Sequence, residues 1–183
     1  TIQLIPRLSE PTLVTAVLVG ENQPVKKGQP IFQFDRRPYE FKVKKLEAEL
    51  AAAKQNVLVL KADVEVTAAS IPKTQSDLAY AKIESQRYQK LAEDQSGSEQ
   101  DAQKWATQVS VDEANVKVAI AQAELARLKY ESEIDGVNTT VANVQAELDQ
   151  ARYYLDNTTL VAPEDGRIVN LQVRPGMVAG EIR

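Results

Sequence analysis

The residue types that most enzymes use for nucleophilic or acid–base chemistry are missing here, because this sequence of 183 residues has no histidine and no cysteine. It can supply no His or Cys metal ligand, no Cys nucleophile, no His general base and no disulfide. The remaining candidates are grouped carboxylates, Asp112 with Glu113 and the set Glu131, Glu133 and Asp135. Helical residues one or two positions apart do not face each other, so a solvated face is the favoured interpretation. The sequence therefore predicts no catalytic, metal or cofactor site.

Charge and hydropathy narrow the class of protein further. The formal net charge is −4, which argues against a nucleic-acid partner, since such proteins normally present a basic face. No apolar run is longer than four residues, whereas a membrane-spanning helix needs about 20. Because the sequence begins at Thr1 rather than at Met, we expect any signal or membrane anchor to lie outside it.

Glycine and proline mark the elements that must organise the chain. Residues 1–37 and 159–183 contain 11 of the 15 Gly and Pro residues, and the 121 residues between them contain four. The charge divides at the same places, with +2 in the first segment, −6 in the middle and zero in the last. Two turn-rich ends flanking a middle that avoids helix breakers indicate one domain interrupted by a long insertion.

The first half of the insertion predicts a long helix with a coiled-coil seam. Asp35 is a candidate N-cap, Pro38 falls in the first turn, where proline is tolerated, and Pro72 predicts a local kink. Apolar or small residues recur at alternating spacings of three and four, as a coiled coil requires. The seam consists of Val43, Leu46, Leu50, Ala53, Val57, Leu60, Val64, Thr67, Ile71, Thr74, Leu78, Ala81, Ser85 and Tyr88.

A second helix is predicted from a capping-box variant at Ser98–Asp101 to Asp156–Asn157. Its lower seam comprises Tyr130, Ile134, Val137, Val141, Val144, Leu148, Ala151 and Leu155. Its upper seam, in a shifted register, comprises Val111, Ala114, Val118, Ala121, Leu125 and Leu128. The shift predicts a stutter near 128–134, beside Gly136. Five residues separate the helices, so we expect an antiparallel hairpin with its tip at 91–100, packed alongside other hairpins.

The two ends of the chain predict one small β-domain. Strand-like and turn-like segments alternate in both, and aligning Gly28 with Gly180 gives a weak internal repeat. Neither half is long enough to bury a core alone. The predicted fold class is α+β, a long antiparallel helical hairpin inserted between two halves of a lipoyl- or biotinyl-like β-sandwich. The expected division is 1–37, 38–158 and 159–183.

The motifs that flank the hairpin resemble those of a known family. Asp35–Tyr39 reads D-x-x-P-Y at the end of the first half, and Thr159–Gly166 reads T-x-x-A-P-x-D-G in the return strand. In this order around a coiled coil they resemble the haemolysin-D-like periplasmic adaptors, or membrane fusion proteins, of tripartite efflux and secretion systems. The likeness covers nearly the whole chain and is greatest for the branch that serves major-facilitator multidrug pumps.

This resemblance implies a docking site at the hairpin tip. Family members that dock the outer-membrane channel carry an Arg, a Leu four residues later and a Ser seven residues beyond it, matched by Arg87, Leu91 and Ser98. The residue before that Ser is usually β-branched, whereas here it is Gly97. From the residues alone, Ser98 could equally be an N-cap, Leu91 a seam residue and Arg87 a solvated charge.

The same resemblance implies a non-enzymatic adaptor in the periplasm. Its partners would be an outer-membrane channel of the TolC type and an inner-membrane transporter of the major-facilitator, ABC or RND type. It would self-associate as a trimer or hexamer and be anchored to the inner membrane through a segment outside this sequence. A structural coiled-coil spacer or stalk with no transport role is the alternative. A lipoyl or biotinyl carrier is disfavoured, because Lys26-Lys27 lies in a turn without the Met-Lys-Met or Asp-Lys-Ala sequence.

Overall fold

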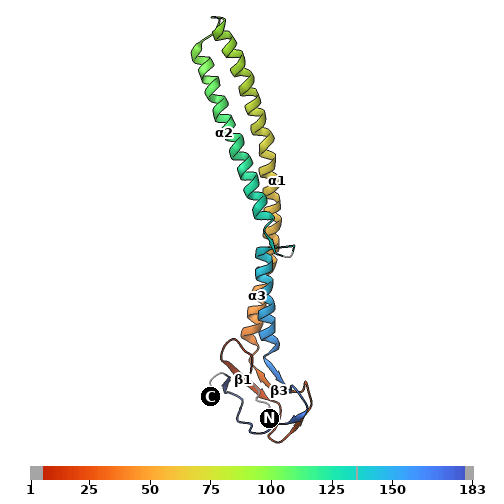
Figure 1. Cartoon of the computed structure of the whole chain (residues 1–183). Helices are drawn as coiled ribbons and strands as arrows, with labels where there is room; N and C mark the ends of the chain where they lie inside the picture. Colours follow the sequence, from red (N-terminus) through yellow and green to blue (C-terminus); the bar gives the residue numbers. More distant parts are fainter. Residues whose placement is uncertain (1–5, 135, 180–183) are drawn as a thin grey trace. The chain divides into compact units, whose positions relative to one another are not determined.

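A computed structural model describes residues 6–134 and 136–179 of the chain (Figure 1). The chain divides into two compact units. One contains residues 1–52 and 140–183, which bring both ends of the sequence together, and the other contains residues 53–139. The elements confirm the predicted α+β class, in which a helical hairpin interrupts a β-domain.

Strands from both ends of the chain pair in one β-domain. The four-stranded antiparallel sheet has the order β6–β3–β1–β8, so the strands of the second half flank those of the first. β2 and β7 form a second, two-stranded pair. The strands are β1 Thr12–Val17, β2 Pro24–Val25, β3 Pro30–Phe34, β6 Thr159–Val161, β7 Gly166–Arg167 and β8 Val178–Ala179. This interleaving confirms that neither half closes a core alone.

The core of the β-domain is small and apolar. Its fully buried side chains include Ile31 and Val14, and Leu160, Ile168, Leu171 and Val173 of the second half pack against them. The buried members are Val14, Val19, Val25, Ile31, Phe32, Phe34 and Ala162.

The internal repeat has a different register from the one that the sequence predicts. Gly28 N–H donates to Ala162 O at 2.7 Å, and Gly176 N–H donates to Val14 O at 2.9 Å. These two bonds are related by a shift of 148 positions, which matches Gly28 with Gly176; Gly180 lies outside the described residues. Both glycines have a positive φ, 81° and 90°. The same shift relates the bonds Ala162 N→Gln29 O and Val14 N→Met177 O, and the bonds Gln29 N→Lys26 O and Met177 N→Arg174 O.

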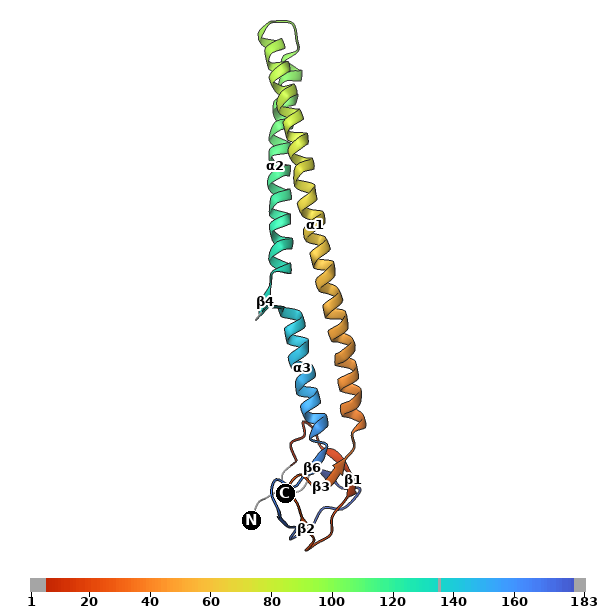
Figure 2. The ribbon, with the colours of Figure 1, turned by 90° about the vertical axis from the view of Figure 1, so that its right-hand side faces the viewer.

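Helices α1 (Arg37–Glu93) and α3 (Thr139–Asp156) leave the β-domain side by side (Figure 2). The predicted N-cap at Asp35 is displaced by one residue, because α1 begins at Arg37 and the Arg36 carbonyl accepts the first helical bond, from Glu40 N–H. Asp35 Oδ1 still accepts the Arg37 N–H at 3.1 Å. Tyr39 is buried, and its hydroxyl lies 2.8 Å from Thr12 Oγ1 of β1. A second core joins the two helices and consists of Val43, Leu46, Leu148 and Ala151, with Leu50 and Leu155 packed against it. Arg152 and Glu47 form an ion pair at 2.9 Å on its surface.

In the unit of residues 53–139, α1 runs antiparallel to α2 (Glu99–Tyr130). Every residue of the predicted α1 seam is buried or half-buried, which confirms that seam. The predicted upper seam of the second helix is wrong, because all six of its residues are exposed. The residues of α2 that face α1 lie two positions earlier, and they include Val109, Asp112, Val116, Ala119, Ala123 and Ala126. Small side chains on this face permit close approach of the two helices.

The second helix of the hairpin is interrupted, whereas the sequence predicts only a stutter near residues 128–134. α2 ends at Tyr130 and α3 begins at Thr139, and β4 (Glu133–Ile134) pairs with β5 (Val137–Asn138) between them. Gly136 has φ +77°, as a tight hairpin turn requires. Between the ion pairs Lys82–Glu113 and Glu47–Arg152, α1 has 35 positions and the returning arm has 39. The β4–β5 hairpin accommodates these four extra residues outside the two helices of the returning arm.

Two further expectations concern α1 and the membrane. α1 continues through Pro72 as one helix of 57 residues, and the expected kink remains a prediction. Among residues 6–134 and 136–179, no helix combines the length and apolar character needed to cross a bilayer.

Candidate functional site

The tip of the hairpin is a turn with a defined hydrogen-bond pattern. α1 ends at Glu93, and Gln95, two residues later, has a positive φ of 55°. Ser96 N–H donates to Leu91 O at 2.9 Å and Gln95 N–H donates to Ala92 O at 3.1 Å. This pair of bonds is a Schellman motif, which satisfies the last carbonyls of the helix. In this motif the position with positive φ is usually a glycine. Here it is Gln95, so the sequence does not indicate the motif.

The three residues that the family resemblance singles out lie on this tip. Arg87 and Leu91 belong to the last two turns of α1. The Arg87 side chain is exposed, and the Leu91 side chain is half-buried. Ser98 precedes α2 as its N-cap residue with extended backbone, but within the described chain its side chain makes no capping bond. The predicted capping box is therefore not formed, and the exposed Ser98 side chain is not used to hold the helix start.

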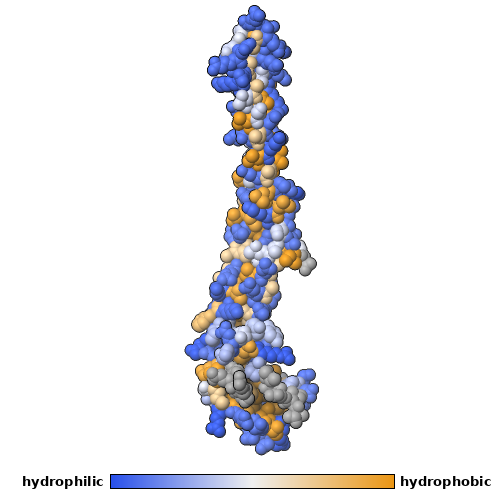
Figure 3. Space-filling view, turned by 60° about the vertical axis from the view of Figure 1, so that its left-hand side comes forward, coloured by the Kyte–Doolittle hydropathy of each residue, from blue (hydrophilic) through white to orange (hydrophobic). Residues whose placement is uncertain are grey.

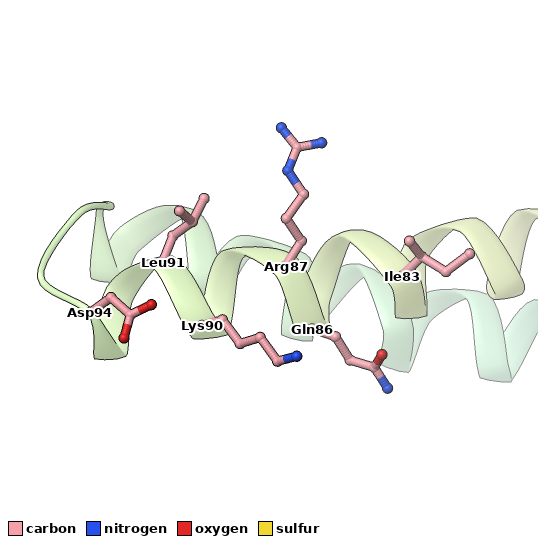
Figure 4. A pocket seen from close by; sticks show the side chains of 6 residues that line it. All are labelled: Ile83, Gln86, Arg87, Lys90, Leu91 and Asp94. Atoms are coloured by element: carbon pink, nitrogen blue, oxygen red, sulfur yellow. The ribbon is translucent and has the colours of Figure 1, made fainter.

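A shallow groove runs along α1 beside the tip (Figure 4). One row of side chains, Ile83, Arg87 and Leu91, points to one side, and a second row, Gln86, Lys90 and Asp94, points to the other. Each row follows the four-residue spacing of a helix ridge, and such grooves accept a ridge of another helix. Sequence reasoning found two of these six residues, although the four-residue spacing could have revealed the rest.

The groove combines apolar and cationic groups. Ile83 is 63% exposed, an unusually open position for an isoleucine. Arg87 forms an ion pair with Glu84 at 3.4 Å, and its guanidinium carbon lies 5.6 Å from the centre of the Tyr88 ring. An exposed ion pair of this kind contributes little to stability.

An aromatic cluster holds the two helices together behind the groove. The Trp105 ring of α2 stacks on Tyr88 of α1, with centroids 6.2 Å apart, and meets Tyr80 edge-on at 5.8 Å. Trp105 thus packs against α1 through both rings. These contacts fix the register of α1 and α2 close to the tip.

The carboxylate groups considered for chemistry are dispersed. Asp112 is buried on the inner face of α2, where it accepts hydrogen bonds from Gln108 and Asn115. Glu113 points elsewhere and pairs with Lys82 of α1 at 3.1 Å. Within residues 6–134 and 136–179, no three acidic side chains are grouped so that they could hold a metal ion, and Asp135 lies outside this part.

Comparisons with known proteins agree with this architecture. Residues 63–131 match the family model described as "RND MFP, alpha-helical hairpin domain". The whole chain aligns at 30% identity with 54% of "Multidrug resistance protein MdtN" of Shigella flexneri. A "UPF0194 membrane protein" of Citrobacter koseri is 31% identical over 89% of the chain and 51% of its own length. The chain thus spans about half the length of the curated relatives it matches.

A solved structure supports the fold. "Crystal structure of MacA from Actinobacillus actinomycetemcomitans" superposes with a TM-score of 0.54 at 17% identity, over 96% of this chain and 44% of that one. At this level of identity the match concerns the fold, a β-domain with an inserted helical hairpin.

Proposed function

We propose that this chain, which carries the α-helical hairpin domain of a membrane fusion protein, is the periplasmic adaptor part of a multidrug efflux or secretion system. It would connect an inner-membrane transporter with an outer-membrane channel of the TolC type. The observation that carries this proposal is the alignment of the whole chain, β-domain and hairpin together, with a multidrug resistance protein. The same alignment favours an adaptor over a coiled-coil spacer, which would need no β-domain of this plan.

In this function the protein performs no covalent chemistry. The transporter supplies the energy, and the adaptor fixes the distance and orientation between the two membrane partners. The transporter would be of the major-facilitator, ABC or RND type. Self-association into a trimer or hexamer would repeat the tip around the axis of a channel.

Docking at the tip would use Arg87, Leu91 and Ser98. The groove along α1 presents Leu91 and Ile83 as an apolar surface beside the Arg87 guanidinium. A helical tip of the channel that offers an apolar ridge with a carboxylate or carbonyl groups fits this surface. Ser98 adds an exposed polar side chain at the start of α2.

The test is loss of export after substitution at the tip. The double variant Arg87→Ala/Leu91→Ala in the complete adaptor should abolish drug resistance in a strain that depends on this system, with unchanged expression and helicity. Arg127→Ala is the matched control, because it removes an exposed arginine of α2 that also pairs with a glutamate three residues before it. Full resistance with the double variant would overturn docking at these residues. Full export after deletion of the whole adaptor would instead favour the spacer.

A further inference from the structure

The Arg87 guanidinium contacts two neighbouring side chains of α1. Its carbon atom lies 5.6 Å from the centre of the Tyr88 ring, within the range of a cation–π contact. Its Nη1 atom lies 3.4 Å from Glu84 Oε1. The Arg87 side chain is 63% exposed and that of Glu84 only 13%, so the cation faces solvent while the carboxylate that it contacts is largely covered.

α2 holds the Tyr88 ring in place. Tyr88 is half-buried on the α1 seam, and its ring stacks on Trp105 with centroids 6.2 Å apart and planes inclined by 16°. Trp105 is itself half-buried, four positions before Val109 and seven before Asp112. This spacing puts the indole on the face of α2 that meets α1. A residue of α2 therefore determines where the Tyr88 ring lies, and the ring in turn contacts Arg87.

Two restraints on one arginine have a consequence for binding. Fixing an arginine side chain costs more conformational entropy than fixing most other side chains. A guanidinium that is already held near its bound position loses less freedom when a partner arrives, which strengthens binding without any new contact. The exposed ion pair with Glu84 is a weak restraint alone. The Tyr88 ring adds a second restraint of a different kind, because a planar guanidinium packs well on an aromatic face.

The surface around Arg87 makes its position important for recognition. Hydrophilic side chains dominate the end of the hairpin on the face shown in Figure 3, whereas apolar side chains are more frequent further along it. In the groove of Figure 4, Arg87 is the central residue of its row, four positions after Ile83 and four before Leu91. Charged groups at an interface contribute specificity more than raw affinity. Arg87 is the charged member of this row, and its guanidinium offers five donors in one plane.

We propose that Trp105 and Tyr88 position Arg87 for docking of the hairpin tip. Trp105 of α2 fixes the Tyr88 ring, and the ring together with Glu84 holds the guanidinium beside the groove. Trp105 and Tyr88 are thus positioning residues, which act through Arg87. The guanidinium that they present fits a carboxylate or carbonyl oxygens at the end of a partner helix. This inference rests on the tip docking within the proposed function and adds two residues to it.

NMR relaxation of the arginine side chains tests the positioning without any partner. The Nε–Hε order parameter of Arg87 is measured in protein labelled with nitrogen-15 at arginine. Tyr88→Leu and Trp105→Leu should each lower it by about a third or more, whereas Tyr88→Phe, which keeps the ring, should preserve it. Arg127 is the internal reference, because it pairs with glutamates of its own arm. An Arg87 order parameter that does not respond to Tyr88→Leu would overturn the proposal.

Tyr80→Leu is the matched control within the aromatic cluster. Tyr80 meets the same Trp105 ring edge-on at 5.8 Å, but it lies seven positions before Arg87 on α1. Tyr80→Leu and Tyr88→Leu each remove one aromatic pair, so both should lower the melting temperature of the hairpin. Only Tyr88→Leu should lower the order parameter of Arg87. Equal loss of order in both variants would show that the cluster only stabilises the hairpin, which would contradict a positioning role.

A double-mutant cycle tests whether Trp105 acts through Arg87 in docking. Binding of the complete adaptor to the purified TolC-type channel of the same strain is measured with Arg87 present and in Arg87→Ala. Trp105→Leu should weaken binding by about 3- to 10-fold with Arg87 present and by less than about twofold in Arg87→Ala. Equal weakening in both backgrounds would overturn the proposal, because Trp105 would then contribute without Arg87.

The outcomes separate this inference from the proposed function. Full export by Arg87→Ala/Leu91→Ala would show that tip docking at these residues is wrong, and the positioning for docking with it. Loss of export in that variant, combined with unchanged channel binding by Trp105→Leu and Tyr88→Leu, would leave docking intact and overturn only the positioning roles.

Discussion

Gly97 lies directly against Leu91 at the tip of the hairpin. A Cβ atom at position 97 would come within 2.8 Å of Leu91 Cβ and 3.2 Å of the Leu91 carbonyl carbon. Neither atom belongs to the flexible end of a side chain, so any other residue forces the turn to move. The haemolysin-D-like pattern has a β-branched residue at this position. The structure therefore gives the departure a physical reason: here the turn closes on Leu91, a residue proposed to dock the channel.

Substitution of Gly97 should open the tip. In Gly97→Val the turn must shift away from Leu91, and we expect a local destabilisation of about 1–3 kcal/mol, typical of overpacking. Hydrogen exchange of peptides spanning residues 88–99 should be at least tenfold faster than in the unchanged protein. Peptides from the β-domain should keep their exchange rates.

A neighbouring substitution provides the control for this prediction. Gln95 has φ +55°, where a side chain is unfavourable and glycine is not. Gln95→Gly should therefore slow exchange at the tip or leave it unchanged, since it relieves the backbone without touching Leu91. Faster exchange in Gln95→Gly than in Gly97→Val would show that the Gly97–Leu91 contact does not control the turn.

The α1 seam and the pairing of the two β-halves could be predicted because each depends on a local pattern. On α1 the residues at alternating spacings of three and four from Val43 to Leu78 are nearly all apolar, and all of them are buried or half-buried. The motifs at Asp35–Tyr39 and Thr159–Gly166 fix where the hairpin leaves and rejoins the β-domain, because strands β3 and β6 pair beside them.

The inner face of α2 could not be predicted, because two of its faces carry the same spacing. One has Val111, Val118 and Leu125, and the other has Ala119 and Ala126. Hydrophobicity favours the first as the seam, whereas the helices approach through the second. The four-residue excess on the returning arm appeared as a register shift, but only the Asp135-Gly136 dipeptide hinted at a β-turn.

At the tip, spacing located Arg87, Leu91 and Ser98 but not their surroundings. The contact between Gly97 and Leu91 depends on a positive φ at a glutamine, which sequence preferences disfavour. Lys90 and Asp94 were not identified because their role in the groove follows from the two rows on α1, not from a motif.

The start of α1 should show a dependence on pH. Asp35 accepts hydrogen bonds from the Arg37 side chain at 3.0 and 2.7 Å and from its backbone N–H, and these bonds hold the pKa of Asp35 below its ordinary value. A lowered pKa in the folded state means that the carboxylate stabilises the fold at neutral pH. This contribution is lost as the pH falls through the lowered pKa.

In Asp35→Asn the acid-dependent part of this stability should disappear, so the melting temperatures of the two proteins should converge as the pH approaches about 2. In Arg37→Ala the pKa of Asp35 should rise toward its ordinary value, as measured by NMR titration of the carboxyl carbon. An Asp35 pKa at or above the ordinary value in the unchanged protein would contradict the hydrogen bonds between Asp35 and Arg37.

The repeat in the β-domain predicts equal costs at two distant glycines. Gly28 and Gly176 have φ +81° and +90°, and no atom lies within 4 Å of a Cβ built on either. Alanine there is disfavoured by the backbone alone, so Gly28→Ala and Gly176→Ala should each lower the free energy of unfolding by about 1–2 kcal/mol. Gly166 has equally open space around it but no positive φ. Gly166→Ala should therefore change the free energy of unfolding by less than about 0.5 kcal/mol. Urea denaturation of the three variants measures these differences. A large cost at Gly28 with none at Gly176 would show that the two halves are not energetically equivalent, despite the matching hydrogen bonds.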